Sequence, residues 1–353
     1  MISSRLLTLV RCPDCGEAIE APARGYVCKG CHRTFGAEEG AFIDLRPTVT
    51  YSEQTKYVDE ALHADARHET VSPPLLSAAI RNDMLRAFLR LASGDSVIDL
   101  GCGSGRALVW NRDLGAYQVG IDVSPYFARE ALGGIDLALG DLRRLPFADG
   151  SFTKAYALDV FEHLSREALS AVLKDAARVL APGGALFVYS HVRKNAPIAQ
   201  GLRFINRMAA RLDRAGAIDL AEERLRKSDH LNPLADIPDL EAVVGAAGFR
   251  VDRIRYYTPL VGGIVENLLV RLAARMMEKR QLRRVQGREV KAGRLARAEA
   301  KERIARRGPT YIALRGLTVL MKLDLLMFGR VRSGPFFALL VKEQNGAPCA
   351  SSM

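Results

Sequence analysis

Short apolar runs alternate with amphipathic segments between residues 96 and 192. The runs SVIDL, YQVGID, IDLALGD, FTKAYALD and GGALFVYSHV are typical of short buried strands. Before the last of them, REALSAVLKDAARVL places apolar residues at helical spacing. Strands that alternate with helices in this way predict a parallel sheet with helices on both faces. Ligands of such sheets bind at the carboxyl ends of the strands.

Two further apolar runs predict a sixth and a seventh strand. They are GFRVDRIRYYT and PFFALLVKE, and about 75 residues separate them. A loop of that length without secondary structure is uncommon, so the intervening segment should form helices. A second insertion, at about 193–228, also has a helical pattern in FINRMAARLDRAGAIDLAEERLRK.

The first run leads into a glycine-rich loop, VIDLGCGSGR, with the pattern D-x-G-x-G-x-G. Glycines let the backbone adopt positive φ and approach a ligand closely. Dinucleotide-binding folds use a similar pattern, but their third glycine comes three residues after the second, and here the spacing is two. Two acids follow in the next strands. Asp122 is placed to take both hydroxyls of a ribose, and Asp141 to accept from an adenine amino group.

This order of elements resembles the class I S-adenosylmethionine-dependent methyltransferases over residues 75–258, with a last strand near 335–342. The resemblance implies an α/β fold with a Rossmann-like, seven-stranded, mostly parallel sheet. It also implies where the cofactor binds. The methionine end would lie at Asp99 and at the loop with Gly101, Cys102, Gly103 and Gly105. The ribose would lie at Asp122 and Val123, the adenine would lie at Asp141 and Leu142, and Asp159 would close the pocket.

Four cysteines near the N-terminus have the spacing CxxC–x12–CxxC: Cys12, Cys15, Cys28 and Cys31. Two such turns brought together supply a closed tetrahedral set of thiolates, which suits structural zinc and leaves no position for a substrate. The segment resembles the zinc ribbons related to the small activator subunit of eukaryotic methyltransferases. Similar ribbons precede the catalytic domain of bacterial large-subunit rRNA guanine methyltransferases.

The stretch ALDVFEHL carries the candidate catalytic residues Glu162 and His163. Histidine suits general-base work near neutral pH, so His163 is the candidate base. Together with Asp159, the pair also resembles the acid-x-x-Glu-His group that binds a divalent ion in ubiquinone-biosynthesis O-methyltransferases, although Asp stands here where that family has Glu. Alternatively, Glu162 and His163 only shape their loop. His191 and His230 could face a substrate or be hydrogen-bonded structural histidines.

The positive charge of the chain is concentrated in one segment. The formal net charge is +11, and residues 271–307 contain 14 Lys and Arg against 4 Glu. A local basic surface suits phosphates or anionic lipid. The apolar stretch 311–328 that follows is interrupted by three charged residues, so a spanning helix is not expected. A basic helix flanked by amphipathic helices favours an anionic membrane surface, whereas RNA is less favoured because the run has no interleaved aromatics.

These patterns predict a zinc ribbon (1–50), a methyltransferase core (51–258), a helical cap (259–334) and a last strand with a tail (335–353). The expected activity is methyl transfer to a hydrophobic or lipid-linked small molecule, at oxygen. No secretory signal is visible, which predicts a cytoplasmic protein, peripheral on the inner face of the membrane. Two alternatives stay open: an RNA base methyltransferase, and a cofactor-binding scaffold that activates a partner.

Overall fold

The computed structural model describes residues 2–22, 25–38, 42–49, 71–193, 199–218, 230–257, 260–265 and 308–343, together with residues 269 and 272. Most of the basic segment 271–307 therefore lies outside the described residues, as do the tail 344–353 and part of the insertion at 193–228.

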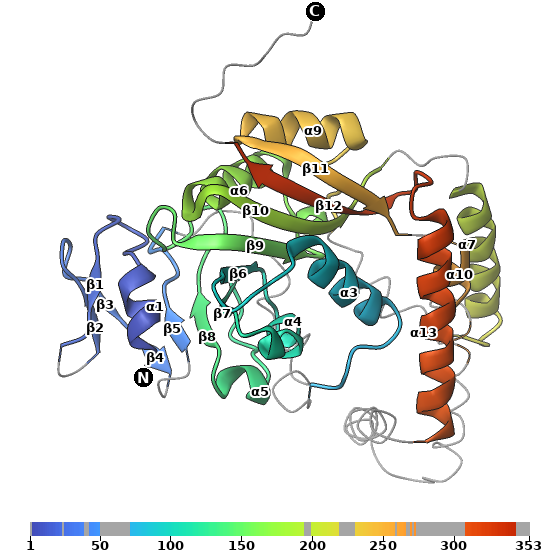
Figure 1. Cartoon of the computed structure of the whole chain (residues 1–353), viewed down its shortest axis with the longest axis horizontal. Helices are drawn as coiled ribbons and strands as arrows, with labels where there is room; N and C mark the ends of the chain where they lie inside the picture. The colour runs from blue at the N-terminus through green and yellow to red at the C-terminus, as the bar shows by residue number, and fades with distance from the viewer. Residues whose placement is uncertain are drawn as a thin grey trace, which may run out of the picture.

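One mostly parallel sheet runs through the molecule in the strand order β11-β12-β10-β9-β6-β7-β8-β5-β4 (Figure 1). Strands β6 to β10 pair in parallel with one another, and β12 is antiparallel to both β10 and β11. These seven strands are the ones expected: β6 Ser96–Leu100, β7 Tyr117–Asp122, β8 Asp136–Leu139, β9 Phe152–Leu158, β10 Leu180–His191, β11 Phe249–Tyr256 and β12 Pro335–Lys342. The predicted fold class is confirmed.

The predicted number of seven strands is wrong, because the sheet has nine. The two additional strands, β4 (Ala37–Glu38) and β5 (Phe42–Asp44), come from the segment assigned to the ribbon. Strand β5 pairs in parallel with β8, with Ile43 opposite Ala138. Phe42, Ile43 and Leu45 are buried in the core of the large sheet. The burial of these apolar side chains stabilises the addition of β5 to that sheet.

Helices cover both faces of the sheet, as expected. On one face α6 (Arg166–Val179) and α9 (Ile237–Ala246) pack in the core that also contains Leu6 and Val10. The other face is covered by α3 (Ser77–Leu89), α4 (Arg106–Trp110) and α5 (Arg129–Leu132). Two short 3-10 turns, η2 (Arg112–Leu114) and η3 (Phe161–His163), follow α4 and β9.

The described parts of the insertions are helical, as predicted. They form α7 (Ala199–Arg214), α10 (Leu260–Ile264) and α13 (Pro309–Phe328), which lie together at one end of the molecule (Figure 1). Helix α13 rests on the core through the buried Met321, and Thr318 Oγ1 accepts a 2.9 Å hydrogen bond from the amide of Leu76. Among the helices that the structure describes, none is long and apolar enough to cross a membrane.

The N-terminal segment has a small antiparallel sheet of its own, built from β1 (Ile19–Glu20), β2 (Tyr26–Cys28) and β3 (Thr34–Phe35). Helix α1 (Ser4–Leu9) precedes it and is capped by Ser3, whose hydroxyl accepts from the amide of Leu6 at 2.9 Å. The segment packs directly on the large sheet, because its side chains belong to the same hydrophobic core.

Candidate functional site

The glycine loop turns sharply at the carboxyl end of β6. Gly101 and Gly105 have φ of +75° and +78°, a left-handed conformation that side chains rarely adopt. Space is restricted as well: a Cβ at Gly101 would lie 2.7 Å from Val160 Cγ2, and one at Gly105 would lie 2.8 Å from Ala131 Cβ. Both positions therefore require glycine. The contact with Val160 also places the glycine loop directly beside the loop that follows β9.

Asp122, the last residue of β7, holds the glycine loop with its side chain. Its Oδ2 accepts a hydrogen bond from the amide of Gly103 at 2.8 Å, and its Oδ1 accepts from the amide of Ser124 at 2.9 Å. The amides of Gly101 and Cys102 in turn donate to the carbonyl of Ile121, at 2.9 and 3.0 Å. The residues expected around the ribose, Asp122 and Val123, thus lie beside the loop expected around the methionine end.

The other two acids of the expected cofactor site have different surroundings. Asp99 is buried beneath the loop, and this burial, with the negative charge of Asp122, raises the pKa of its carboxyl well above the usual value. Asp141 is paired with Arg143, whose Nη2 lies 2.6 Å from Oδ2. This partner was missed, although it lies only two residues along the chain. Leu142 lies near Gly101, with Cδ1 3.7 Å from the position of a Cβ there.

Asp159 begins the loop after β9 in an unusual backbone conformation, with φ of +56°. Its carboxylate forms an ion pair with Arg81 of α3. The guanidinium of Arg81 also lies over the ring of Tyr189, 5.3 Å from its centroid. Arg81 was not predicted as a site residue, because it precedes the glycine loop and belongs to no recognisable motif.

Glu162 is buried, with an exposed fraction of 1%, and contacts two residues at the end of β10. Ser190 Oγ donates to its Oε2 at 2.9 Å, and His191 Nδ1 lies 3.4 Å from its Oε1. Burial on its own would raise the pKa of Glu162, but contact with His191, together with Ser190, brings that pKa below the ordinary value. The carboxylate is therefore ionised beneath the histidine ring.

Three histidines named separately in the sequence come together here. The ring of His163 packs edge-on against His230, with 4.7 Å between centroids, and His191 lies 6.4 Å from His230. The amides of Leu231 and Asn232 donate to the carbonyl of Glu162 at 2.8 and 3.0 Å, which fixes the loop that carries His230. The histidine cluster (His163, His191 and His230) thus lies at the carboxyl ends of β9 and β10.

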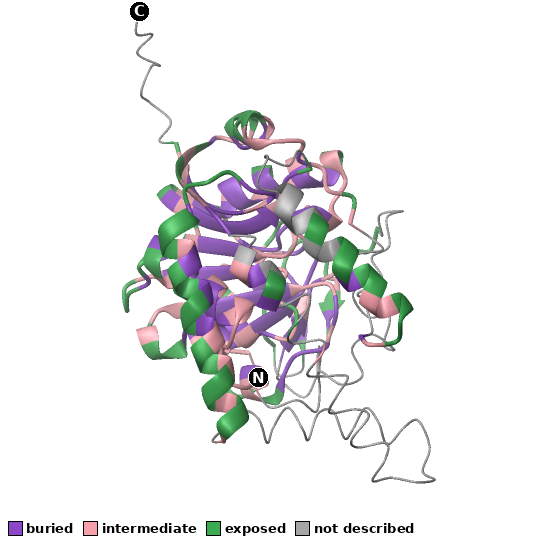
Figure 2. Cartoon of the chain, turned by 90° about the vertical axis from the view of Figure 1, so that its right-hand side faces the viewer, coloured by how far each residue is buried: buried purple, intermediate pink, exposed green. Residues whose placement is uncertain are grey.

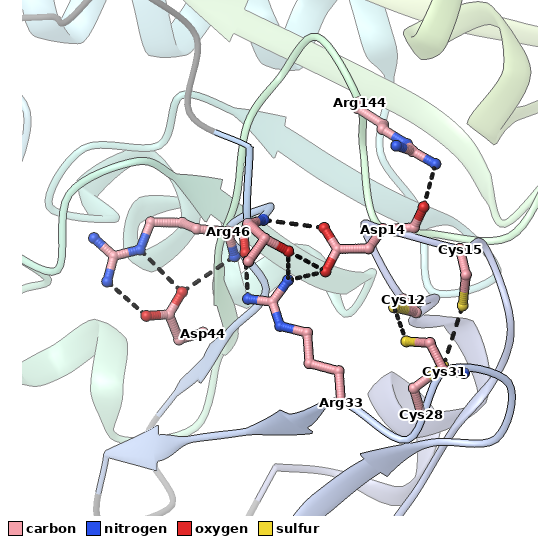
Figure 3. Close-up of polar contacts among 10 residues, drawn as sticks. Cys12, Asp14, Cys15, Cys28, Cys31, Arg33, Asp44, Arg46 and Arg144 are labelled. Atoms are coloured by element: carbon pink, nitrogen blue, oxygen red, sulfur yellow. Dashed lines mark hydrogen bonds and ion pairs between the residues drawn. The ribbon is translucent and has the colours of Figure 1, made fainter.

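The four cysteines form a compact thiol cluster in the ribbon (Figure 3). Their sulfur atoms all lie within 4.8 Å of one another, with 3.6 Å between Cys12 and Cys31 and 3.3 Å between Cys15 and Cys28. Sulfurs bound to tetrahedral zinc at about 2.3 Å lie about 3.8 Å apart, so this donor set fits zinc. Within the described parts of the chain no other set of three or more ligand atoms is this compact, and Asp159, Glu162 and His163 do not form one.

Asp14, between the first two cysteines, connects the thiol cluster to the core (Figure 3). Its carboxylate accepts from the amide of Thr48 at 3.0 Å and from Arg33 Nη1 at 2.5 Å, and its carbonyl accepts from Arg144 Nη2 at 3.0 Å. The amide of Arg11 donates to the carbonyl of Pro146 at 2.8 Å. Residues of the ribbon therefore hold the loop 141–147, which begins with the predicted adenine residues.

Comparison with known proteins gives a family match that includes the glycine loop. Residues 98–188 match the family described as a methyltransferase domain. They form a class I S-adenosylmethionine-dependent methyltransferase domain. The match runs from β6 to β10 and includes the glycine loop, Asp122, Asp141 and the loop that carries Glu162 and His163. Which of these residues contact the cofactor stays a prediction.

Several known methyltransferases are similar to the chain over part of its length. Methyltransferase GfsG of Streptomyces halstedii is 30% identical over 42% of this chain and 60% of its own length. Sterol 4-C-methyltransferase strm-1 of Caenorhabditis elegans is 31% identical over 30% of this chain and 34% of its own length. A solved structure of phosphoethanolamine N-methyltransferase 2 from Haemonchus contortus, with S-adenosyl-L-methionine, is 17% identical, with a TM-score of 0.49, over 84% of this chain and 61% of that one. The chain thus spans 60% or less of the two curated relatives.

Proposed function

We propose that the protein transfers the methyl group of S-adenosylmethionine to an oxygen atom of a hydrophobic or lipid-linked small molecule at a membrane surface. The observation that carries the methyl transfer is the contact between two loops. Val160, which leads into Glu162 and His163, packs on Gly101 of the cofactor loop. The cofactor supplies an electrophilic methyl group, so the protein has to position a nucleophile and accept its proton.

The histidine cluster favours an acceptor that loses a proton, such as a hydroxyl group. Imidazole changes its protonation state near neutral pH, which makes it suitable for this step. The rings of His163, His191 and His230 lie beside the strand ends where ligands of this fold bind. This placement supports transfer to oxygen.

The outer face of α13 supports the hydrophobic acceptor and the membrane. Apart from Phe328 at its end, the large exposed apolar residues of α13 fall within an arc of about 120° at 3.6 residues per turn. Their exposed fractions range from 46% to 81%, and they are Ile312, Val319, Leu320, Leu323, Leu326 and Met327. Such a continuous apolar face is unusual on a soluble surface and is typical of an interaction site. Arg315 lies at one edge of this face, as suits a helix lying in a membrane interface. Lys322, on the same edge, forms an ion pair with Asp83 of α3.

Neighbouring features extend this surface. On α7, the exposed Phe204 and Met208 lie among Arg207, Arg211 and Arg214. Viewed from the end of the molecule where α7 and α13 lie, long runs of exposed residues face outward (Figure 2). The basic segment 271–307 comes just before α13 in the sequence, and its excess of positive charge favours an anionic bilayer.

The acceptor class can be tested without knowing the acceptor. Methyl-tritiated S-adenosylmethionine is added with the purified protein to a cell lysate, and the lipid, RNA and protein fractions are counted separately. We expect label in the lipid fraction and none above background with Asp122→Ala. Label in RNA would replace our proposal with the RNA alternative, and cofactor binding without label in any fraction would favour the scaffold alternative.

Membrane association is tested by sedimentation with vesicles. The protein should sediment with vesicles that contain phosphatidylserine and stay in solution with pure phosphatidylcholine. The variant Leu323→Glu/Leu326→Glu, at exposed positions of α13, should lose binding, whereas the control Val49→Glu, at an exposed position of the ribbon, should keep it. Equal sedimentation of both variants would rule out the α13 face. RNA binding with a steep salt dependence and no vesicle binding would reverse the assignment.

A further inference from the structure

We infer that His191, oriented by the buried carboxylate of Glu162, is the general base that takes the proton of the acceptor. This inference rests on the proposed transfer to oxygen and names the residue that carries it out. It differs from the expectation drawn from the sequence, in which His163 is the base.

The contacts of Glu162 favour His191 over His163 as the general base. Both carboxylate oxygens point toward the end of β10, where Oε2 accepts from Ser190 and Oε1 lies 3.4 Å from His191 Nδ1. Glu162 itself has an exposed fraction of 1%, so it cannot reach an acceptor, whereas 31% of the His191 side chain is exposed. The ring of His163 instead packs edge-on against His230.

A carboxylate at one ring nitrogen determines what the other nitrogen can do. His191 Nδ1 is buried and makes no hydrogen bond within the described residues, and Glu162 Oε1 lies 3.4 Å from it. A proton on Nδ1 would be directed toward this carboxylate, and the lone pair of Nε2 would then be available to accept. A buried carboxylate also stabilises the imidazolium that forms when Nε2 takes a proton. Glu162 is then a positioning residue, and His191 is the residue that contacts the acceptor.

The other charged and titratable groups around His191 are compatible with this role. Asp159 and Glu162 face it from the loop after β9, Tyr189 from its own strand with 5.5 Å between rings, and His230 from the loop before α9. The charge of Asp159 is offset by its ion pair with Arg81. Glu162 therefore remains as the negative charge next to the ring.

The step balances without any further reactant. The acceptor O–H gives its proton to Nε2 of His191 while the oxygen forms a bond to the methyl carbon. The bond from that carbon to the sulfonium sulfur breaks, and its electron pair stays on sulfur as a neutral thioether. The imidazolium afterwards returns the proton to water.

Nitrogen NMR on protein labelled with ¹⁵N-histidine tests the pair directly and needs no acceptor. We expect the neutral His191 ring to carry its proton on Nδ1, and the isosteric change Glu162→Gln to lose this tautomer preference. Ser190→Ala, which removes the other partner of Glu162, should retain it. A proton on Nε2 of His191 in the unaltered protein would overturn the inference, whether or not the protein methylates lipids.

Rates test the catalytic role, with a chloroform–methanol lipid extract as acceptor and methyl-tritiated cofactor as donor. His191→Ala should lower the rate at least about 100-fold, the usual contribution of a general base. Added imidazole or high pH should restore part of that rate, and the affinity for S-adenosylhomocysteine should stay within twofold. His163→Ala should lower the rate much less than His191→Ala does. A large loss in His163→Ala with little loss in His191→Ala would return the role to His163.

Discussion

The carboxylate of Asp122 and the amide of Gly103 are joined by a hydrogen bond of 2.8 Å that ties the end of β7 to the glycine loop. The same carboxylate is predicted to bind the ribose of the cofactor. The prediction thus gives Asp122 two tasks: to hold the loop expected around one end of the cofactor, and to bind another part of the cofactor. Preorganisation of this kind lowers the entropic cost of binding.

The change Asp122→Ala should weaken binding of S-adenosylhomocysteine at least tenfold, or about 1.4 kcal/mol. It removes the acceptor of two backbone amides, at Gly103 and Ser124, in addition to the predicted contact with the ribose. Isothermal titration calorimetry measures the effect. Asp252→Ala, on the edge strand β11, is the matched control and should bind normally. An unchanged affinity in Asp122→Ala would refute the assignment.

Gly105→Ala should lower the free energy of unfolding by about 1–2 kcal/mol, the cost of a left-handed conformation for a residue with a side chain. The new methyl group would also lie 2.8 Å from Ala131 Cβ. Urea denaturation measures the loss. In the control Gly94→Ala the new methyl group meets nothing within 4 Å, and stability should barely change. Equal midpoints for the two variants would contradict the prediction.

Loss of the zinc predicted for the thiol cluster should weaken cofactor binding, although the cluster does not belong to the predicted cofactor site. The reason is that Arg11 and Asp14 hold the carbonyl of Pro146 and the side chain of Arg144, in the loop that contains Asp141. Cys28→Ser should therefore reduce both the zinc content, measured by mass spectrometry, and the affinity for S-adenosylhomocysteine. His32→Asn, next to Cys31 but exposed, should leave both intact. Full affinity in metal-free Cys28→Ser protein would show that the two sites are independent.

Asp14 should contribute stability at neutral pH that disappears in acid. Burial on its own would raise the pKa of Asp14, but Thr48 and Arg33 hold it below the ordinary value. A carboxyl with a lowered pKa stabilises the folded protein above its unfolded pKa of about 3.9, and the contribution is lost as the pH falls through the folded value. The difference in unfolding free energy between the unaltered protein and Asp14→Asn should therefore narrow below about pH 4. A difference that stays constant from pH 7 to pH 3 would contradict this origin.

Features set by local sequence were predictable. The strands of the core follow from short apolar runs. Helix α6 follows from helical spacing that begins after a serine N-cap, where Ser165 accepts from the amide of Ala168. The glycine loop was predictable because closely spaced glycines after a strand are typical of a backbone that turns with positive φ. Each of these patterns lies within about 15 residues and needs no information about distant partners.

Features set by distant partners were not predictable. Arg81 and Asp159 are 78 positions apart, and Glu162 meets His191 only because β9 and β10 are neighbours in the sheet. Three candidate histidines were identified in the sequence. Their mutual contacts depend on the hydrogen bonds that join the loop after His230 to the carbonyl of Glu162. Strand β5 has three residues, which is too short to show a period, so its place in the large sheet could not be seen.

The pairing of β5 with β8 also affects how the chain avoids self-association. Without β5, strand β8 would be an open edge with the apolar residues Leu137, Ala138 and Leu139, and open edges are templates for pairing between molecules. The strand that covers it is followed at the edge by β4, which is only two residues long and ends in Glu38. Ile43 and Ala138 are 95 positions apart, so this protection depends on a contact between distant parts of the chain. Variants that loosen the ribbon should therefore aggregate during folding.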